Sequence, residues 1–220
     1  MTPAKATSPR ASRSRSGSSA RPDGGCLILG AIIAGGRASR FGSDKALARW
    51  RGQPLIAHAR AALAPWCEAL VVCGREWGCM TSLPDLPGPG RGPLGGIAAA
   101  LAHAQRKGYA SVLTIGCDMP DVPAGLLAAL VGTNPSYCPE APILGHWPAA
   151  QAADLVKLLS APAQAGAQGG NHRSRDPGLL LAQEHGGGRS VRGWATAVNA
   201  TPIPAPAPLR NINTPADLPA

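Results

Sequence analysis

The sequence predicts an α/β fold, a single-domain, mostly parallel sheet flanked by helices. Short, continuous apolar runs at 26–34, 69–74 and 110–116 alternate with segments of helical spacing at 54–64 and 95–107. Runs that are apolar throughout suit strands buried on both faces, as in a parallel sheet. Alternation of such runs with helices is typical of βαβ units. The chain of 220 residues is long enough to bury one sizeable core.

The helices are indicated by residues at their ends. Pro54 opens the segment 54–64, and a proline is well tolerated in the first turn because its missing N–H is not needed there. The segment 95–107 ends in basic residues followed by Gly108, a common signal for a helix C-terminus. A short helix is expected at 124–131. The Pro- and Gly-rich residues 80–94 are predicted to form a loop.

The second half of the chain has weaker patterns. We expect a strand at 141–147, a helix at about 148–159 and an extended segment at 202–208. The end, LRNINTPADL, predicts a short strand, then a turn or a capped helix start at Thr214-Pro215. Residues 160–188 are rich in Gly, Ala and Gln, and a loop of that length is uncommon in a compact domain. We therefore interpret 160–188 as a flexible insertion in a domain spanning 26–220.

The N-terminal segment 1–25 differs in composition from the rest of the chain. It holds five basic residues and one acidic residue, a large part of the formal net charge of +9, and it is rich in Ser, Ala and Pro. We predict a disordered basic tail. It lacks the apolar stretch of a secretory signal, although its Arg- and Ser-rich character also resembles an organellar transit peptide. No 18-residue apolar stretch is free of charges and turn signals, so we expect no membrane partner.

The six cysteines do not form a recognisable metal or disulfide pattern. None belongs to a C-x-x-C pair, and no His/Cys cluster has the spacing of a zinc site. Without a secretory signal, we interpret them as reduced thiols of a cytoplasmic protein.

Residues 31–47, AIIAGGRASRFGSDKAL, carry the clearest functional signal. An apolar run ends at two glycines, and a basic, hydroxyl-rich loop leads to Asp-Lys and a stretch of helical character. A glycine turn between a strand and a helix can direct backbone N–H groups at phosphate oxygens, and basic side chains can offset the phosphate charge. From the loop alone, a tight turn with solvated arginines is an equally good interpretation. The loop matches neither the Walker A pattern nor G-x-G-x-x-G.

Four motifs in order resemble the nucleotidyltransferases of molybdenum cofactor biosynthesis. AGGRASRFGSDKAL resembles A-G-G-x-x-x-R-[MF]-G-x-D-K, and the Asp44-Lys45 pair favours the guanylyltransferase branch. DLPGPGRGPLGG at 85–96 is similar to the family's Asp followed by G-P-L-x-G. GCDMPDVP at 116–123 resembles C-D-x-P-x-[IVL]-P, and NINTPADL at 211–218 resembles N-[IV]-N-T-P-x-[ED]-L. Each motif is weak alone, but four in the right order are a strong signal.

The resemblance implies a nucleotide-diphosphosugar-transferase-like (Rossmann-like) sheet and a reaction. GTP would be attacked at its α-phosphorus by the phosphate of molybdopterin, giving the guanine dinucleotide cofactor and pyrophosphate, with Mg²⁺ required. The protein partners would be molybdoenzymes or cofactor-delivery proteins. The alternative is a sibling enzyme that uses CTP on the same pterin, or a nucleotide on a sugar phosphate.

Three residues are the candidates for catalysis. Asp118 follows the strand at 110–116, so its carboxylate would lie at the sheet edge, where one or two carboxylates and substrate phosphates commonly hold Mg²⁺. The alternative for Asp118 is a structural turn aspartate. Lys45 would neutralise charge on the leaving pyrophosphate, with Arg40 as a weaker candidate for the same task. We see no need for a covalent nucleophile, because the attacking phosphate is already ionised.

The remaining candidates would bind the substrates. Asp85 matches the family's nucleotide-contacting aspartate, and Asn211 and Asn213 match its paired asparagines, which would contact the pterin. The backbone contacts to the nucleotide would come from Ile33, Ala34, Gly35 and Gly36. Cys73 stands where many relatives have Asn, so that side-chain amide contact is lost.

A different class, a nucleic-acid-binding protein, is suggested by the net charge and the Arg/Ser tail. Only eight aromatic residues occur, and none is interleaved with basic residues in a stacking pattern. We therefore expect no specific nucleic-acid partner.

Overall fold

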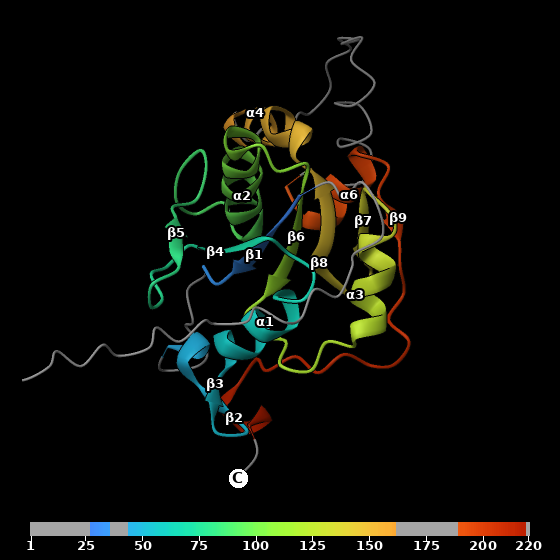
Figure 1. The fold of residues 1–220 in the computed structure, drawn as a ribbon. Coiled ribbons are helices and arrows are strands. Elements are labelled where there is room, and N and C mark those ends of the chain that lie inside the picture. The colour runs from blue at the N-terminus through green and yellow to red at the C-terminus, as the bar shows by residue number, and fades with distance from the viewer. Residues whose placement is uncertain (1–26, 36–43, 162–188, 219–220) are drawn as a thin grey trace, which may run out of the picture.

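A seven-stranded sheet forms the centre of the computed structural model (Figure 1). The structure describes residues 27–35, 44–161 and 189–218. In spatial order the strands are β5 (Thr81–Leu83), β4 (Ala69–Cys73), β1 (Ile28–Ile33), β6 (Ser111–Gly116), β8 (Ala141–Pro148), β7 (Ser136–Cys138) and β9 (Thr201–Pro202).

The sheet is mostly parallel, as predicted. The strands β5, β4, β1 and β6 run parallel to one another, while β8 is antiparallel to both β6 and β7. The strands β7 and β9 pair in parallel. The three apolar runs seen in the sequence are thus the adjacent strands β4, β1 and β6, and their carboxyl ends lie at one edge. The reversed direction of β8 was not predicted, because an apolar run carries no information about strand direction.

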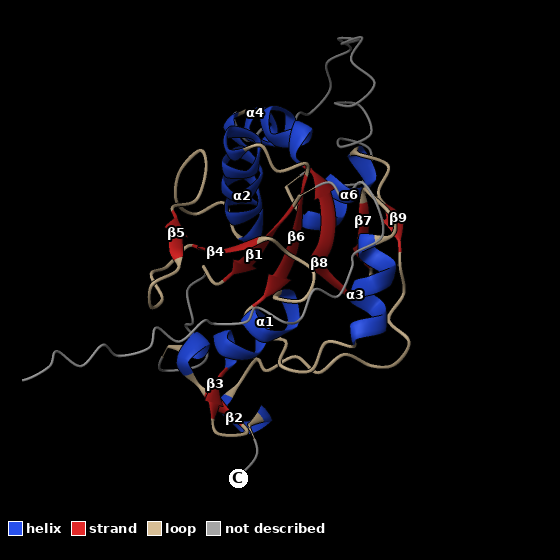
Figure 2. Cartoon of the chain, in the orientation of Figure 1, coloured by secondary structure: helices blue, strands red, loops and turns tan. Residues whose placement is uncertain are grey.

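Helices cover both faces of the sheet (Figure 2). The helices α1 (Leu55–Leu63) and α3 (Ala124–Val131) pack on one face, and α2 (Pro93–Lys107), α4 (Ala152–Ser160) and α6 (Val191–Ala197) pack on the other. The strand β1 shows why its sequence is continuously apolar. Ala31 and Ile33 face the core beneath α2, and Ile32 faces the core beneath α1. Burial on both faces removes the polar alternation of a half-exposed strand.

Several elements differ from the sequence expectations. The expected loop 80–94 contains the edge strand β5, and the strands β7 and β9 and the helix α6 were not predicted. Strands of two or three residues are too short to show a two-residue period. The structure has no strand at 209–213, so the expected short strand there is wrong. The capped turn at Thr214 is confirmed, as the 3-10 helix η3 (Pro215–Asp217) with a capping box.

The segment after Asp44 is only briefly helical. It forms one 3-10 turn, η1 (Lys45–Leu47), and then the two-stranded hairpin β2 (Arg49–Trp50) and β3 (Gln53–Pro54). A second 3-10 turn, η2 (Ala149–Gln151), precedes α4 and forms the start of the helix expected at about 148–159.

Two predictions lie outside the described residues. The basic tail at 1–25 and nearly all of the insertion at 160–188 fall there, so both stay predictions, as does the domain boundary at residue 26. Within the described ranges, every helix is too short or too polar to span a bilayer.

Candidate active site

The site lies where the carboxyl ends of β1, β4 and β6 meet. Ile33 and Gly116 are in register on β1 and β6, and the Cys117 N–H donates to the Ile33 carbonyl at 3.3 Å. On the other side of β1, the Ala34 N–H donates to the Cys73 carbonyl at 3.1 Å. The turn after β1 and the loop that carries Asp118 therefore lie side by side, at the edge where open α/β sheets bind ligands.

Lys45 and Asp118 form an ion pair across this edge. The Lys45 Nζ donates to Asp118 Oδ2 at 2.9 Å, and the two side chains are 20% and 22% exposed. Lys45 begins the turn η1, which is capped by Asp44, whose Oδ1 accepts from the Ala46 N–H at 3.2 Å. The cap holds the start of η1, and from this turn Lys45 reaches a carboxylate 73 positions away in the chain.

The C-terminal segment completes this cluster. Lys45 Nζ also donates to Asn213 Oδ1 at 3.1 Å, and the Ile212 N–H donates to the backbone carbonyl of Asp118 at 2.9 Å. The N–H of Asn213 donates to Asp217 Oδ2 at 2.7 Å, which holds the turn that follows. Lys45, Asp118 and Asn213, predicted from three distant motifs, thus meet at one point.

Asp85 lies beside the glycine turn. The structure brings Gly35 and Gly74 into backbone contact, so that a Cβ on Gly74 would lie 2.5 Å from the Gly35 Cα. A Cβ on Gly35 would lie 3.8 Å from both carboxylate oxygens of Asp85, and one on Gly95 would lie 3.0 Å from the Asp85 Cβ. Partial burial raises the pKa of the Asp85 carboxyl. Glycine at these three positions therefore lets the two turns and the Asp85 side chain pack closely against one another.

Arg75 was missed by the sequence reasoning. It follows Gly74 directly after β4, and its two terminal nitrogens donate to both carboxylate oxygens of Asp44. The Arg75 guanidinium, by these hydrogen bonds, holds the pKa of the Asp44 carboxyl below its usual value. A signal was present, because a basic residue just after a buried parallel strand lies at the same edge as the other candidates.

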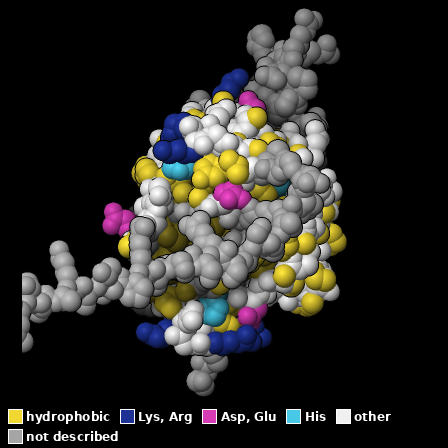
Figure 3. All heavy atoms as spheres, viewed as in Figure 1, with side chains coloured by type: hydrophobic (Ala, Val, Ile, Leu, Met, Phe, Trp, Pro, Cys, Tyr) yellow, Lys and Arg dark blue, Asp and Glu magenta, His cyan; other side chains and the backbone are white. Residues whose placement is uncertain are grey.

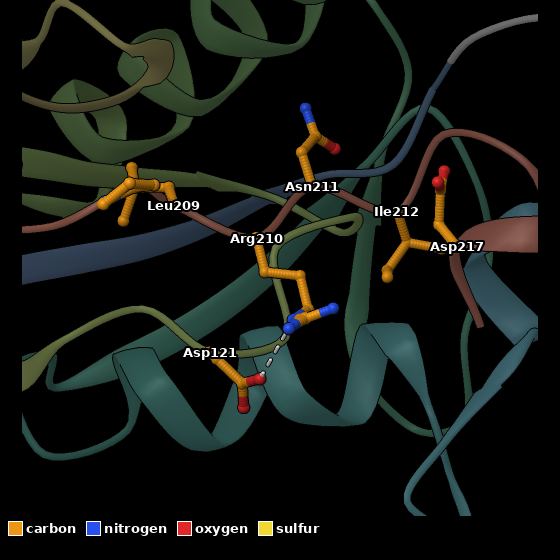
Figure 4. A pocket seen from close by; sticks show the side chains of 7 residues that line it. Asp121, Leu209, Arg210, Asn211, Ile212 and Asp217 are labelled. Carbon is orange, nitrogen blue, oxygen red and sulfur yellow. Dashed lines mark ion pairs between the residues drawn. The ribbon is translucent and has the colours of Figure 1, made fainter. Parts of the chain in front are cut away.

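Two cavities lie near this edge, and the Lys45–Asp118 pair lines the smaller of them. One, of about 230 Å³, is lined by the strand-end residues Ile33, Ala34, Gly35, Lys45, Arg75 and Asp118, among others. The other, of about 470 Å³, lies along the C-terminal segment and includes Asp121, Arg210, Asn211 and Asp217 (Figure 4). In Figure 4, Arg210 points towards Asp121, while Asn211 points to the opposite side of the segment. Asn211 and Asn213 are therefore brought to different places, Asn213 to Lys45 and Asn211 to the larger cavity.

The larger cavity borders a basic end of the molecule. Arg51 and Arg210 lie over the Trp50 ring, 5.5 Å and 5.0 Å from its centroid, and Arg51 donates to Asp121 Oδ1 at 3.3 Å. Figure 3 shows basic side chains gathered at this end, where Figure 1 places the β2–β3 hairpin. The lining of the cavity itself holds two carboxylates, Asp121 and Asp217, and one cation, Arg210, so the other basic side chains lie around the cavity rather than in it.

The thiols near the site are not nucleophiles. Burial raises the pKa of both Cys73 and Cys117 to about 12, with the charge of Asp85 adding to the shift at Cys73 and that of Asp118 at Cys117. Both side chains are therefore protonated at neutral pH, and a protonated thiol is a poor nucleophile. Neither of these two thiols is therefore a candidate for a covalent intermediate.

The residues of the site fit a magnesium ion shared with phosphates, and do not fit a cage made by the protein alone. Within the described ranges, no three His, Cys, Asp or Glu residues gather into a metal-binding group. Among the described residues, Asp44 and Asp118 are the two carboxylates that line the strand-end cavity, and Asp44 is held by Arg75. A Cβ on Gly116 would lie 2.6 Å from Asp118 Oδ1, so glycine gives this carboxylate its room. One carboxylate with substrate phosphates is a common Mg²⁺ site.

Two predicted site residues, Gly36 and Arg40, lie outside the described residues, and their roles stay predictions. The other eight, Ile33, Ala34, Gly35, Lys45, Asp85, Asp118, Asn211 and Asn213, all lie at or next to this edge.

A glycine turn, a strand-end carboxylate and a lysine above a mostly parallel sheet define a nucleotide-binding α/β transferase. The chain belongs to the family described as MobA-like NTP transferase domain, which matches residues 30–172. It is 34% identical to a molybdenum cofactor guanylyltransferase of Rhodobacter capsulatus, over 87% of this chain and 93% of that protein. It is 32% identical to one from Rhizobium johnstonii, over 87% and 90% of the two chains.

Solved structures agree on the fold. The molybdopterin-guanine dinucleotide biosynthesis protein A of Archaeoglobus fulgidus is 19% identical, with a TM-score of 0.56 over 86% of this chain and 94% of that chain. A nucleotidyl transferase of Methanothermobacter thermautotroptrophicus has the same TM-score, at 17% identity over 88% and 94% of the chains. The predicted fold class is thus confirmed.

Proposed function

We propose that this protein is a molybdenum cofactor guanylyltransferase, which transfers GMP from GTP to the molybdopterin form of the molybdenum cofactor. The relatives from Rhodobacter and Rhizobium, similar over nearly their whole length, carry this name. The observation that carries the proposal is the meeting of Lys45, Asp118 and Asn213 at the strand-end cavity, while the neighbouring Asn211 and Ile212 line the larger one. A reaction between two substrates needs two adjoining sites with charge-stabilising groups between them.

The cavity at the strand ends would take GTP, and the larger one would take the pterin. In the reaction, an oxygen of the molybdopterin phosphate bonds to the α-phosphorus of GTP. The bond from that phosphorus to the bridging oxygen of the β-phosphate breaks, and pyrophosphate carries away the electron pair. Lys45 lines the strand-end cavity and would neutralise charge on the leaving pyrophosphate. Asn213, which contacts Lys45, and Asn211, in the larger cavity, would position the pterin substrate.

Asp118 would hold Mg²⁺, which when bound neutralises phosphate charge. Lys45 occupies Asp118 Oδ2 in this structure, so the ammonium must move from the carboxylate towards phosphate when the nucleotide enters. The backbone of Ala34 and Gly35 would lie against the nucleotide, where the contact of Gly35 with Gly74 makes the turn narrow. Gly36 and Arg40 follow in the same loop and are proposed to contribute there as well.

We propose that Asp85 recognises the guanine base of GTP. A carboxylate accepts hydrogen bonds from the adjacent N1–H and N2–H groups of guanine. Cytosine offers only one donor on that edge, next to the acceptor N3, and an acceptor facing an acceptor is repulsive. Loss of a buried hydrogen-bond partner gives strong discrimination in such sites. Asp85→Asn should therefore weaken GTP binding more than CTP binding.

The function is tested with purified protein, Mg²⁺ and molybdopterin, given GTP or CTP in parallel. We expect the guanine dinucleotide and pyrophosphate from GTP, and a large loss in Asp118→Asn, a nearly isosteric variant without the charge. Turnover with CTP alone would overturn the base assignment. We place this reaction in the cytoplasm and infer that molybdoenzymes or cofactor-delivery proteins receive the product.

A further inference from the structure

Arg75 lines the proposed nucleotide cavity but has no task in the reaction described above. It shares this cavity with Lys45 and Asp118, and its side chain is 20% exposed. Its backbone is fixed, because the Ser82 hydroxyl donates to the Arg75 carbonyl at 2.7 Å. The backbone that carries the guanidinium is therefore fixed at the edge of the sheet, and a change of the Arg75 side-chain torsions is enough to move the guanidinium.

The four charged side chains that line this cavity are paired with one another. Arg75 donates to Asp44 through two nitrogens, and Lys45 donates to Asp118. Two cations and two carboxylates cancel, so these described residues offer a triphosphate no net positive charge. A triphosphate carries several negative charges and needs cations that are free to bind it. An exchange of partners in both pairs would free these two cations for the phosphates of a nucleotide.

Asp44 can lose Arg75 without being left unsatisfied. Its side chain is 43% exposed to water, and its Oδ1 also accepts from the Ala46 N–H at the start of η1. Arg75, in contrast, has an unused donor, since its Nε is buried without an acceptor among the residues that the structure describes. A guanidinium binds phosphate through a planar fork of N–H groups, and the terminal phosphate of a nucleoside triphosphate carries up to two negative charges, against one on Asp44.

We propose that Arg75 is a nucleotide-binding residue, which exchanges Asp44 for the β- or γ-phosphate of the entering nucleoside triphosphate. This inference rests on the proposed nucleotidyltransferase function and adds a phosphate contact to it. Asp44 is the temporary acceptor that keeps the guanidinium at the cavity until the substrate arrives. It follows that the Asp44 carboxylate competes with phosphate for the Arg75 guanidinium because of its charge. The hydrogen bond by which Asp44 caps η1 does not take part in this competition.

The test compares variants of Arg75 and Asp44, with affinity for GTP and GMP measured by calorimetry in Mg²⁺ buffer. Arg75→Met should weaken GTP binding roughly 10- to 100-fold, as expected for the loss of a charged hydrogen-bonding partner, and GMP binding much less. Asp44→Asn should tighten GTP binding a few-fold, because Asn remains a good N-cap but no longer competes. If the ion pair were purely structural, removing either partner would change GTP affinity in the same direction. Opposite changes in GTP affinity would therefore show that Arg75 binds the nucleotide.

Arg106→Met is the matched control, since it removes the same charge at the far end of α2. Arg75→Lys keeps the positive charge but lacks the planar N–H groups of a guanidinium, so it should weaken GTP binding several-fold. This variant replaces Arg75→Met in the test if Arg75→Met does not fold. The proposal is overturned if Arg75→Met behaves like the control, or if Arg75→Met and Asp44→Asn weaken GTP and GMP alike. If the wild-type protein bound CTP and not GTP, only the assignment of guanine as the base would be refuted. The role of Arg75 would then be decided by the affinities of the same variants for CTP and CMP.

Discussion

Gly74→Ala tests the backbone contact between the turn after β1, at Gly35, and the turn after β4, at Gly74. Gly74 has φ +83°, and a Cβ placed on it would lie 2.5 Å from the Cα and 2.8 Å from the N of Gly35. Carbon atoms in contact lie about 3.5 Å apart or more, so the added methyl group overlaps backbone by about 1 Å. No flexible side chain can give way, and one of the turns must move.

The expected loss has two parts. An L-residue in a left-handed conformation costs about 1 kcal/mol or somewhat more relative to glycine, and an overpacked contact costs about 1–3 kcal/mol. The free energy of unfolding should therefore fall by about 2–4 kcal/mol. Because the displaced turn carries the proposed nucleotide contacts of Ala34 and Gly35, GTP turnover should fall by about 100-fold, as for a reactant misplaced by about 1 Å.

Gly108→Ala isolates the conformational part. Gly108 has φ +78°, its Cβ would meet nothing within 4 Å, and it caps the end of α2 remote from the site. This variant should lose about 1 kcal/mol of unfolding free energy, by the same backbone strain, and keep its turnover. Urea unfolding followed by tryptophan fluorescence measures the first quantity, and pyrophosphate release measures the second. If Gly74→Ala and Gly108→Ala lost equal amounts of unfolding free energy and of GTP turnover, the proposed contact between the turns at Gly35 and Gly74 would be refuted.

Three further predictions concern catalysis, pH and the tail. Lys45→Met should lower kcat about 100-fold, as for loss of a charge-stabilising donor, while Lys107→Met on α2 should not; equal rates would remove Lys45 from the mechanism. His146 is buried beside Ser111, and burial lowers its pKa. The unfolded chain therefore takes up the proton first, so the contribution of His146 to stability is complete above about pH 6.5 and is lost as the pH falls below that. His146→Gln should have a flatter dependence of unfolding free energy between pH 7 and 5, and a dependence as steep as that of wild type would contradict this. Removal of residues 1–25 should leave GTP turnover intact, and its loss would favour a functional tail.

The sequence by itself determined the parallel core and most of the residues of the site. The apolar runs that became β1, β4 and β6 can be recognised because burial on both faces leaves a continuous apolar pattern. Parallel strands joined by helices bring their carboxyl ends to one edge, and this rule alone placed the turn at Gly35 near Asp118. The motifs at 211–218 identified Asn213, but nothing in the residues themselves indicated where the C-terminal segment would lie.

Only the tertiary structure decided the reversed strand β8, the short strands β5, β7 and β9, and the helix α6. Their pairing depends on distant partners, and segments of two or three residues have no period of their own. The pairing of Arg75 with Asp44 and the division of Asn211 and Asn213 between two cavities were decided in the same way. The physical reason is that a local pattern records which face of a segment is buried, whereas the partner of a charged side chain depends on which chain segments the fold brings beside it.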